Sequence, residues 1–173
     1  MRRIRLSLAL GLLAAGLVCT GRAAAQQTPR EAARGFYELV VKDAGGGLPD
    51  ERRMRLYGPR MSRDLRALFE RARERQAAAA RAAPDEKPPL ADGCLFSCAF
   101  EGPRRFGVAG VRRSGRFAYV AVRQDAGPGE RVEWTDTLVL VREGGRWVVW
   151  DVRMGCAWQF RMGPTLRAML RGG

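Results

Sequence analysis

Two short apolar runs separated by a pair of glycines dominate the C-terminal part of the chain. Residues 138–141 and 147–152 are rich in β-branched and aromatic side chains, which favour strands. The pair Gly144-Gly145 is typical of a two-residue hairpin turn, because glycine adopts the positive φ that such turns need. The pattern therefore predicts an antiparallel hairpin over residues 131–155.

A two-residue turn also fixes which residues of the two strands face each other. The predicted pairs are Glu143/Arg146, Val141/Val148, Val139/Trp150, Leu138/Asp151 and Asp136/Arg153. The first and last of these pairs bring opposite charges together, as a correct register should.

Side chains alternate along a strand, so this register predicts two faces of the hairpin. One face collects Trp134, Asp136, Leu138 and Leu140 with Trp147, Val149, Asp151 and Arg153. The other collects Thr135, Thr137, Val139 and Val141 with Val148, Trp150 and Val152. The second face is the more uniformly apolar, and the sequence therefore predicts it as the core.

Helical patterns precede this hairpin. Thr28, Pro29 and Glu31 form a capping box at the start of a helix predicted over 29–43, and Ser62 caps a second helix over 62–82. Two further strands, 104–112 and 116–124, follow, and 164–171 is a short last helix. Helices followed by antiparallel strands predict an α+β fold, with N-terminal helices packed on a curved four-stranded antiparallel sheet.

The first 25 residues have the pattern of a secretory signal peptide. Arg2, Arg3 and Arg5 precede a short apolar run at 6–18, and alanines at 23–25 suit a cleavage site. Retention as an anchor, or lipidation at Cys19, is the alternative. We therefore expect a leader at 1–25, a single domain at 26–173 with no later membrane span, and a periplasmic or secreted location.

The charge of the chain is strongly positive. The formal net charge is +13, and removing the four arginines of the leader, Arg2, Arg3, Arg5 and Arg22, leaves +9. This excess indicates either an anionic partner or an arginine-rich composition without a binding role. The basic residues alternate with acids and form no basic arm, so we do not expect nucleic-acid binding.

Three cysteines follow the leader: Cys94, Cys98 and Cys156. In an exported protein they meet oxidising conditions, and the odd number indicates one bridge and one spare thiol. We expect Cys156 to be bonded to Cys98 or Cys94. The chain contains no histidine, so a metal site would need a fourth ligand from elsewhere, and neither a metal nor a cofactor is expected.

The lack of histidine also excludes serine–histidine and cysteine–histidine catalysis. The remaining candidate site is the polar end of the first hairpin face, where Asp136, Asp151 and Arg153 lie beside Trp134, with Trp158 in the following segment. Three interpretations stay open for this cluster: a structural ion pair, an anchor for a ligand, and a general base whose pKa is raised by burial.

Three stretches resemble a family of exported bacterial domains of unknown function. They are PREAARGFYELV, PPLADGCLFSCAFEGPRRFGV and WTDTLVLVREGGRWVVWDVRMGCAW, and together they span nearly all of the chain after the leader. The family has an α+β cone fold similar to nuclear transport factor and cystatin. The family tends to have a small residue where this chain has Cys156, so the cysteines look particular to this branch. The resemblance implies the fold and export, and it implies no activity.

Two functional hypotheses follow. The first is a non-enzymatic exported domain that binds a small molecule or a protein partner on the concave face of the sheet. The second is a small lyase- or isomerase-like enzyme that uses Asp136 or Asp151 as its base. An unpaired buried carboxylate in an apolar cavity would favour the enzyme, and a filled cone with paired carboxylates would favour the binding domain.

Overall fold

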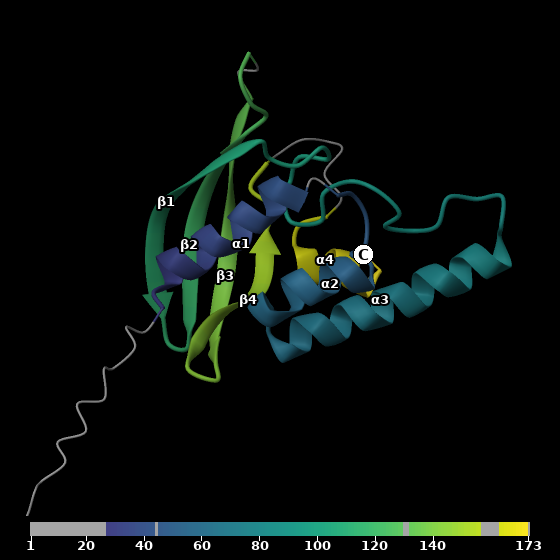
Figure 1. The fold of residues 1–173 in the computed structure, drawn as a ribbon, viewed down its shortest axis with the longest axis horizontal. Helices are drawn as coiled ribbons and strands as arrows, with labels where there is room; N and C mark the ends of the chain where they lie inside the picture. The colour runs from purple at the N-terminus through teal and green to yellow at the C-terminus, as the bar shows by residue number, and fades with distance from the viewer. Residues whose placement is uncertain (1–26, 44, 130–131, 157–162, 173) are drawn as a thin grey trace, which may run out of the picture.

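The computed structural model describes residues 27–43, 45–129, 132–156 and 163–172, and they form the predicted α+β architecture (Figure 1). Helices come first, then the strands, then one short helix. The elements are α1 (Pro29–Asp43), α2 (Glu51–Tyr57), the 3-10 turn η1 (Gly58–Arg60), α3 (Arg63–Ala82), β1 (Arg105–Ser114), β2 (Phe117–Asp125), β3 (Glu133–Glu143), β4 (Arg146–Arg153) and α4 (Leu166–Arg171). The predicted signal peptide and Trp158 lie outside the described residues.

Local capping sets where the two long helices begin. Thr28 and Glu31 bond each other's backbone, since the Thr28 N–H donates to Glu31 Oε2 at 2.7 Å and the Glu31 N–H donates to Thr28 Oγ1 at 3.2 Å. Ser62 Oγ likewise accepts from the Leu65 N–H at the start of α3. Both predicted caps are confirmed, because each satisfies a backbone donor that the first helical turn leaves unpaired.

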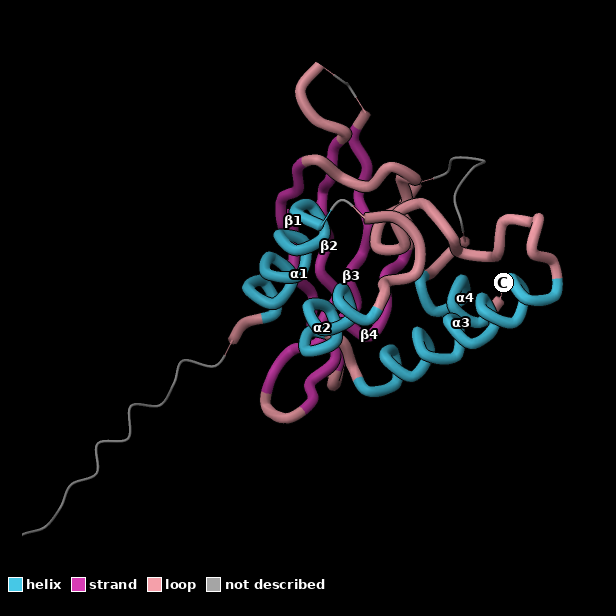
Figure 2. Tube along the Cα trace, turned by 45° about the vertical axis from the view of Figure 1, so that its right-hand side comes forward, coloured by secondary structure: helices cyan, strands magenta, loops and turns pink. Residues whose placement is uncertain are grey.

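The four strands form one antiparallel sheet in the order β1-β2-β3-β4. The helices α1 and α2 lie on one side of this sheet, while α3 and α4 pack together beyond the β4 edge (Figure 1). Figure 2 shows the long loop that returns from the far end of α3 to β1. The helices thus cover one face of the sheet, while on the other face Val139 and Val141 of β3 are also buried.

The register of the main hairpin follows the prediction only near the turn. Glu143 pairs with Arg146 and Val141 with Val148, but a bulge at Trp150 shifts the rest by one residue. Val139 therefore lies opposite Asp151 rather than Trp150, and Arg153 lies opposite Thr137 rather than Asp136. The predicted pairs Val139/Trp150, Leu138/Asp151 and Asp136/Arg153 are wrong, because one inserted residue reverses the face of every residue beyond it.

The bulge also decides which face of the sheet is the core. Val152 joins the main core, whereas Asp151 lies on the opposite face of the sheet, so a second carboxylate is kept out of the layer that already holds Asp136. Val139 and Val141 are buried, with exposed fractions of 1 % and 4 %, but the prediction that their face holds the main core is wrong. The main core uses the other face, and the residues of β3 and β4 that belong to it are Trp134, Leu138, Leu140, Trp147, Val149 and Val152.

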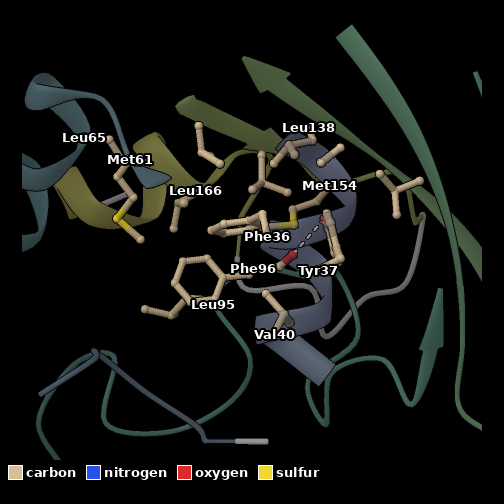
Figure 3. Packing of buried hydrophobic residues seen from close by; sticks show 14 of the residues in the cluster. Phe36, Tyr37, Val40, Met61, Leu65, Leu95, Phe96, Leu138, Met154 and Leu166 are labelled. Carbon is tan, nitrogen blue, oxygen red and sulfur yellow. Dashed lines mark hydrogen bonds between the residues drawn. The ribbon is translucent and has the colours of Figure 1, made fainter. Parts of the chain in front are cut away.

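Aromatic rings from three segments fill the space between this face and the helices. Phe96, in the loop before β1, contacts Phe36 edge-on at 5.3 Å between ring centroids and Tyr57 at 4.7 Å. The buried Tyr37 hydroxyl donates to the Phe96 carbonyl oxygen at 3.1 Å (Figure 3). The loop that carries the cysteines is therefore part of the core, which fixes its position over the end of β3.

Candidate functional site

Asp136 is the polar centre of the helix-covered face of the sheet. Its side chain is 0 % exposed, and Oδ2 accepts hydrogen bonds from the Cys98 N–H at 3.0 Å and from Gln124 Nε2 at 2.8 Å. Oδ1 accepts from the Gly155 N–H at 2.8 Å. The carboxylate therefore ties together the cysteine loop, the neighbouring strand β2 and the segment after β4.

The disulfide joins the same two segments that Asp136 holds. Cys98 is bonded to Cys156 with 6.0 Å between the Cα atoms, and Cys94 is a free thiol, which decides between the two predicted partners. Trp134 Nε1 donates to Ser97 Oγ at 3.0 Å, directly before Cys98 in the chain. Trp134 and Asp136 thus hold the cysteine loop against the end of the hairpin, where the bridge forms.

Burial raises the pKa of Asp136, and the donors from Gly155, Cys98 and Gln124 offset only part of that effect. The pKa of an unfolded aspartate is about 3.9, so the folded protein holds the proton more tightly than the unfolded chain does. The contribution of this group to stability is therefore fully present below about pH 4 and declines as the pH rises through the raised pKa. Asp151 changes stability with pH in the same direction, because burial raises the pKa of this carboxyl too.

We expect Asp136→Asn to remove part of this pH dependence and to lower stability at every pH. The amide presents two donors where the protein already supplies three, which leaves a buried donor unpaired at a cost of about 1–3 kcal/mol. Urea midpoints measured from pH 4 to pH 7 test both effects. A wild-type protein that gains stability across this range, with the gain abolished in Asp136→Asn, would contradict the expected direction of the pH dependence.

Asp151 lies on the opposite side of the hairpin and caps α4. Its Oδ1 accepts from the N–H of Arg167 at 3.0 Å and from its neighbour Val152 at 2.9 Å. Arg167 in turn lies over the Trp150 ring, with Cζ 4.3 Å from the ring centroid. Asp151 therefore adds to the N-cap that Thr165 provides, because its carboxylate complements the positive end of this short helix at the β4 edge of the sheet.

Arg153 lies on the outer face of the sheet, away from the helices. Its guanidinium carbon is 5.2 Å from the centroid of the Tyr119 ring, and that of Arg112 is 4.4 Å from the same centroid. Arg112 is on β1 and Arg153 on β4, so the two cations approach the β2 ring from strands on either side. The predicted cluster is thus divided between two faces, with Trp134 and Asp136 on one and Asp151 and Arg153 on the other.

Small residues beside Tyr119 make a shallow depression on this outer face. Gly110, Ala121, Thr137 and Arg153 follow one another across the four strands in the observed register. The depression is lined by Gly110, Val111, Arg112, Tyr119, Ala121, Thr137 and Arg153. A floor of glycine, alanine and threonine between two arginines leaves room for a group that approaches both cations at once.

The two arginines of this depression, Arg112 and Arg153, lack an acidic partner in the ranges that the structure describes. The ion pairs formed there involve other arginines, such as Arg53 with Asp43 at 2.8 Å and Arg105 with Asp125 at 2.8 Å. The two guanidinium groups beside one ring repel each other, and an anion bound between them would offset this repulsion by attracting both. The arrangement is therefore suited to a carboxylate or another small anion.

Sequence analysis missed four residues of the site. Ser97 and Gln124 lie around Trp134 and Asp136, and Arg112 and Tyr119 lie in the depression with Arg153. Gln124 had a signal, because it continues the buried series of Ala118, Val120 and Val122 at alternate positions of β2. A polar residue in an apolar series indicates a buried hydrogen bond. Tyr119 and Arg112 had none, because their proximity to Arg153 depends on the bulge in β4.

A separate, partly enclosed cavity of about 380 Å³ lies between the end of α1 and the cysteine loop. Its walls include Tyr57, Phe96, the exposed Phe100 and the free thiol of Cys94. Burial raises the pKa of that thiol to about 11, so it is protonated and unreactive at neutral pH. None of Trp134, Asp136, Asp151 and Arg153 lines this cavity.

Comparison with known proteins adds little. No family model and no curated protein matches the chain. A chain in the crystal structure of the type VI native effector–immunity complex Tae3–Tai3 from Ralstonia pickettii is similar at 18 % identity and a TM-score of 0.45, covering 79 % of this chain and 100 % of that one. A likeness of this strength carries no argument about function. The described helices include none long and apolar enough to cross a membrane.

Proposed function

We propose that this protein is an exported, disulfide-stabilised binding domain that holds an acidic protein partner on the outer face of its sheet. The observation that carries the proposal is the pair of guanidinium groups, from Arg112 and Arg153, on the single ring of Tyr119. Export is supported by the pattern of the first 25 residues and by the Cys98–Cys156 bridge, since disulfides persist in oxidising compartments.

An acidic protein suits this face better than a nucleic acid does. Proteins that bind single-stranded nucleic acids stack bases on exposed aromatic rings. Tyr119 is half-buried and already carries two guanidinium groups, so its ring offers little surface for a base. Carboxylates need no stacking surface, and the planar guanidinium binds them through paired hydrogen bonds.

The two carboxylates that the enzymatic alternative would use are bonded within the protein. Both oxygens of Asp136 accept hydrogen bonds from the protein, and Oδ1 of Asp151 accepts two backbone N–H groups. A general base must reach the proton that it removes, and Asp136 is fully buried under the helices. The bonds made by these two carboxylates thus support structural roles for both.

We expect the protein to bind poly-L-glutamate, and Arg153→Gln to weaken that binding about threefold to tenfold, or ~1 kcal/mol, as for the loss of one partly exposed charge contact. The affinity should also fall as salt is raised from about 0.05 M to 0.5 M, because screening weakens exposed charge pairs. Titration by isothermal calorimetry or fluorescence anisotropy measures both effects.

The matched control is Arg81→Gln, which makes the same charge change at an exposed position near the end of α3. If Arg153→Gln and Arg81→Gln lose equal affinity, the binding of poly-L-glutamate depends only on the net charge of the protein, and the proposed face has no special role. Tighter binding of a single-stranded oligonucleotide than of poly-L-glutamate, with the same dependence on Arg153, would overturn the choice of an acidic protein.

A further inference from the structure

The sheet has one covered edge and one open edge. Beyond β4, Met61 forms a parallel bridge to Val149, and Thr165 forms an antiparallel bridge to Arg153, so chain segments lie along that edge. Along the free edge of β1, the edge that faces away from β2, the described residues supply a single hydrogen bond, from Arg30 Nη1 to the Val108 carbonyl oxygen at 2.8 Å. A strand of 10 residues is thus left with unused backbone groups.

The hairpin turn determines which backbone groups of β1 point outward. Ser114 and Phe117 close a two-residue turn, so their backbone groups face each other, and the direction alternates from there along β1. By this alternation the N–H and C=O groups of Val111 and Arg113 point away from β2. Across the bulge at residue 109 the same holds for Val108, in agreement with the bond that its carbonyl accepts from Arg30.

The charge along this edge selects among the chains that could pair there. Arg112 and Arg113 are both exposed and lie over the Tyr119 and Trp147 rings, respectively, without a carboxylate partner in the described ranges. Arg30 adds a third cation at Val108. A second copy of the chain would bring the same arginines to the same edge and be repelled, whereas an acidic strand would be attracted.

We infer that β1 accepts an extended acidic segment of a partner protein as a fifth strand of the sheet. This inference rests on the proposed function in that the partner is acidic, and it adds the mode of binding. Backbone groups at Val108, Val111 and Arg113 supply the hydrogen bonds, and Arg112 selects acidic side chains at alternate positions on the outer face, while the side chains between them lie on the face of Val111. The Val111 side chain, 39 % exposed at this edge, gives the added strand an apolar contact.

The probe for this inference is a fluorescently labelled heptapeptide of alternating glutamate and valine, titrated into the full protein. Val111→Pro removes an outward N–H and no bond to β2, and proline is tolerated at such edge positions. Val111→Ala keeps the N–H and removes most of the side chain. We expect Val111→Pro to weaken binding at least tenfold and Val111→Ala to change it by less than about twofold.

A second comparison does not depend on the folding of any variant. A fully N-methylated form of the same peptide keeps every charge but has no N–H donor, so it should bind the wild-type protein at least tenfold more weakly. Equal binding of the two peptides, or of Val111→Pro and the wild type, overturns the added strand.

The same titrations separate this inference from the proposed function. If Arg153→Gln weakens peptide binding and Val111→Pro does not, the outer face binds without strand addition, and only the inference fails. If Val111→Pro alone weakens it, the edge binds without the outer face, and the proposed function fails. Sedimentation tests whether a second copy of the chain occupies the edge instead. If the wild-type protein is a dimer that does not bind the peptide, and Val111→Pro is a monomer, then a second copy is the occupant and the inference is overturned.

Discussion

Gly155→Ala should cost the protein most of its stability, at least about 4 kcal/mol, which places it among the rare severe single substitutions. A Cβ atom at this position would lie 1.7 Å from the Thr135 carbonyl oxygen, a backbone atom of the adjoining strand that no rotamer change can move. The chain would have to shift, and the shift would take the Gly155 N–H away from Asp136 and Cys156 away from Cys98. We therefore expect little oxidised, cooperatively folding protein.

The yield of oxidised protein and its thermal unfolding transition measure this effect. Gly107→Ala is the matched control, because Gly107 is also in an extended segment at the sheet, yet a Cβ atom there would meet nothing within 4 Å. Alanine in a strand costs less conformational entropy than glycine, so the control should be neutral or slightly stabilising. A Gly155→Ala protein that unfolds like the Gly107→Ala protein would show that the end of the hairpin adapts easily.

The second large effect concerns the Cys98–Cys156 bridge. Replacing both cysteines by serine should lower the free energy of unfolding by about 4 kcal/mol, the value that the chain-entropy model gives for a loop of this length, here a separation of 58 residues. The reason is that the bridge restricts the unfolded chain, while the bonds to Asp136 still hold both segments in the folded state.

Urea unfolding at neutral pH, with and without reductant, tests this expectation. Reduction of the wild-type protein should reproduce the loss seen in the double variant, and the double variant should not respond to reductant. Cys94→Ser is the control, because its thiol is free and lines a cavity, and it should change stability by less than about 1 kcal/mol. An equally large loss in Cys94→Ser would mean that the cavity wall, and not the bridge, is the sensitive feature.

The sequence by itself determined the elements of this fold, because each is specified by neighbouring residues. The capping box at Thr28 and Glu31 and the cap at Ser62 placed the starts of α1 and α3. Gly144 and Gly145 placed the hairpin turn and the pairs next to it. The short helix α2 is not among the elements predicted from the sequence, since its 7 residues are too few for a clear periodicity.

The cysteine pairing was partly within reach of the sequence. An odd number of thiols, in a chain with the pattern of a signal peptide, predicted one bridge to Cys156, but Cys94 and Cys98 were equivalent by spacing. The choice between them depends on the position of the cysteine loop. That position is set by Phe96 in the core and by the bond from the Cys98 N–H to Asp136, which are contacts between segments far apart in the chain.

Only the tertiary structure decided where the candidate site lies. Both faces of the hairpin are apolar near the turn, so the pattern of residues could not show which one the helices cover. The bulge at Trp150 then reversed the faces of the residues after it, which put Val152 in the core and Arg153 beside Tyr119. A bulge of this kind forms when the side chains that it buries and exposes across the whole sheet make the folded state more stable. The order of residues in one strand does not reveal this, because the stabilising contacts are with other strands and helices.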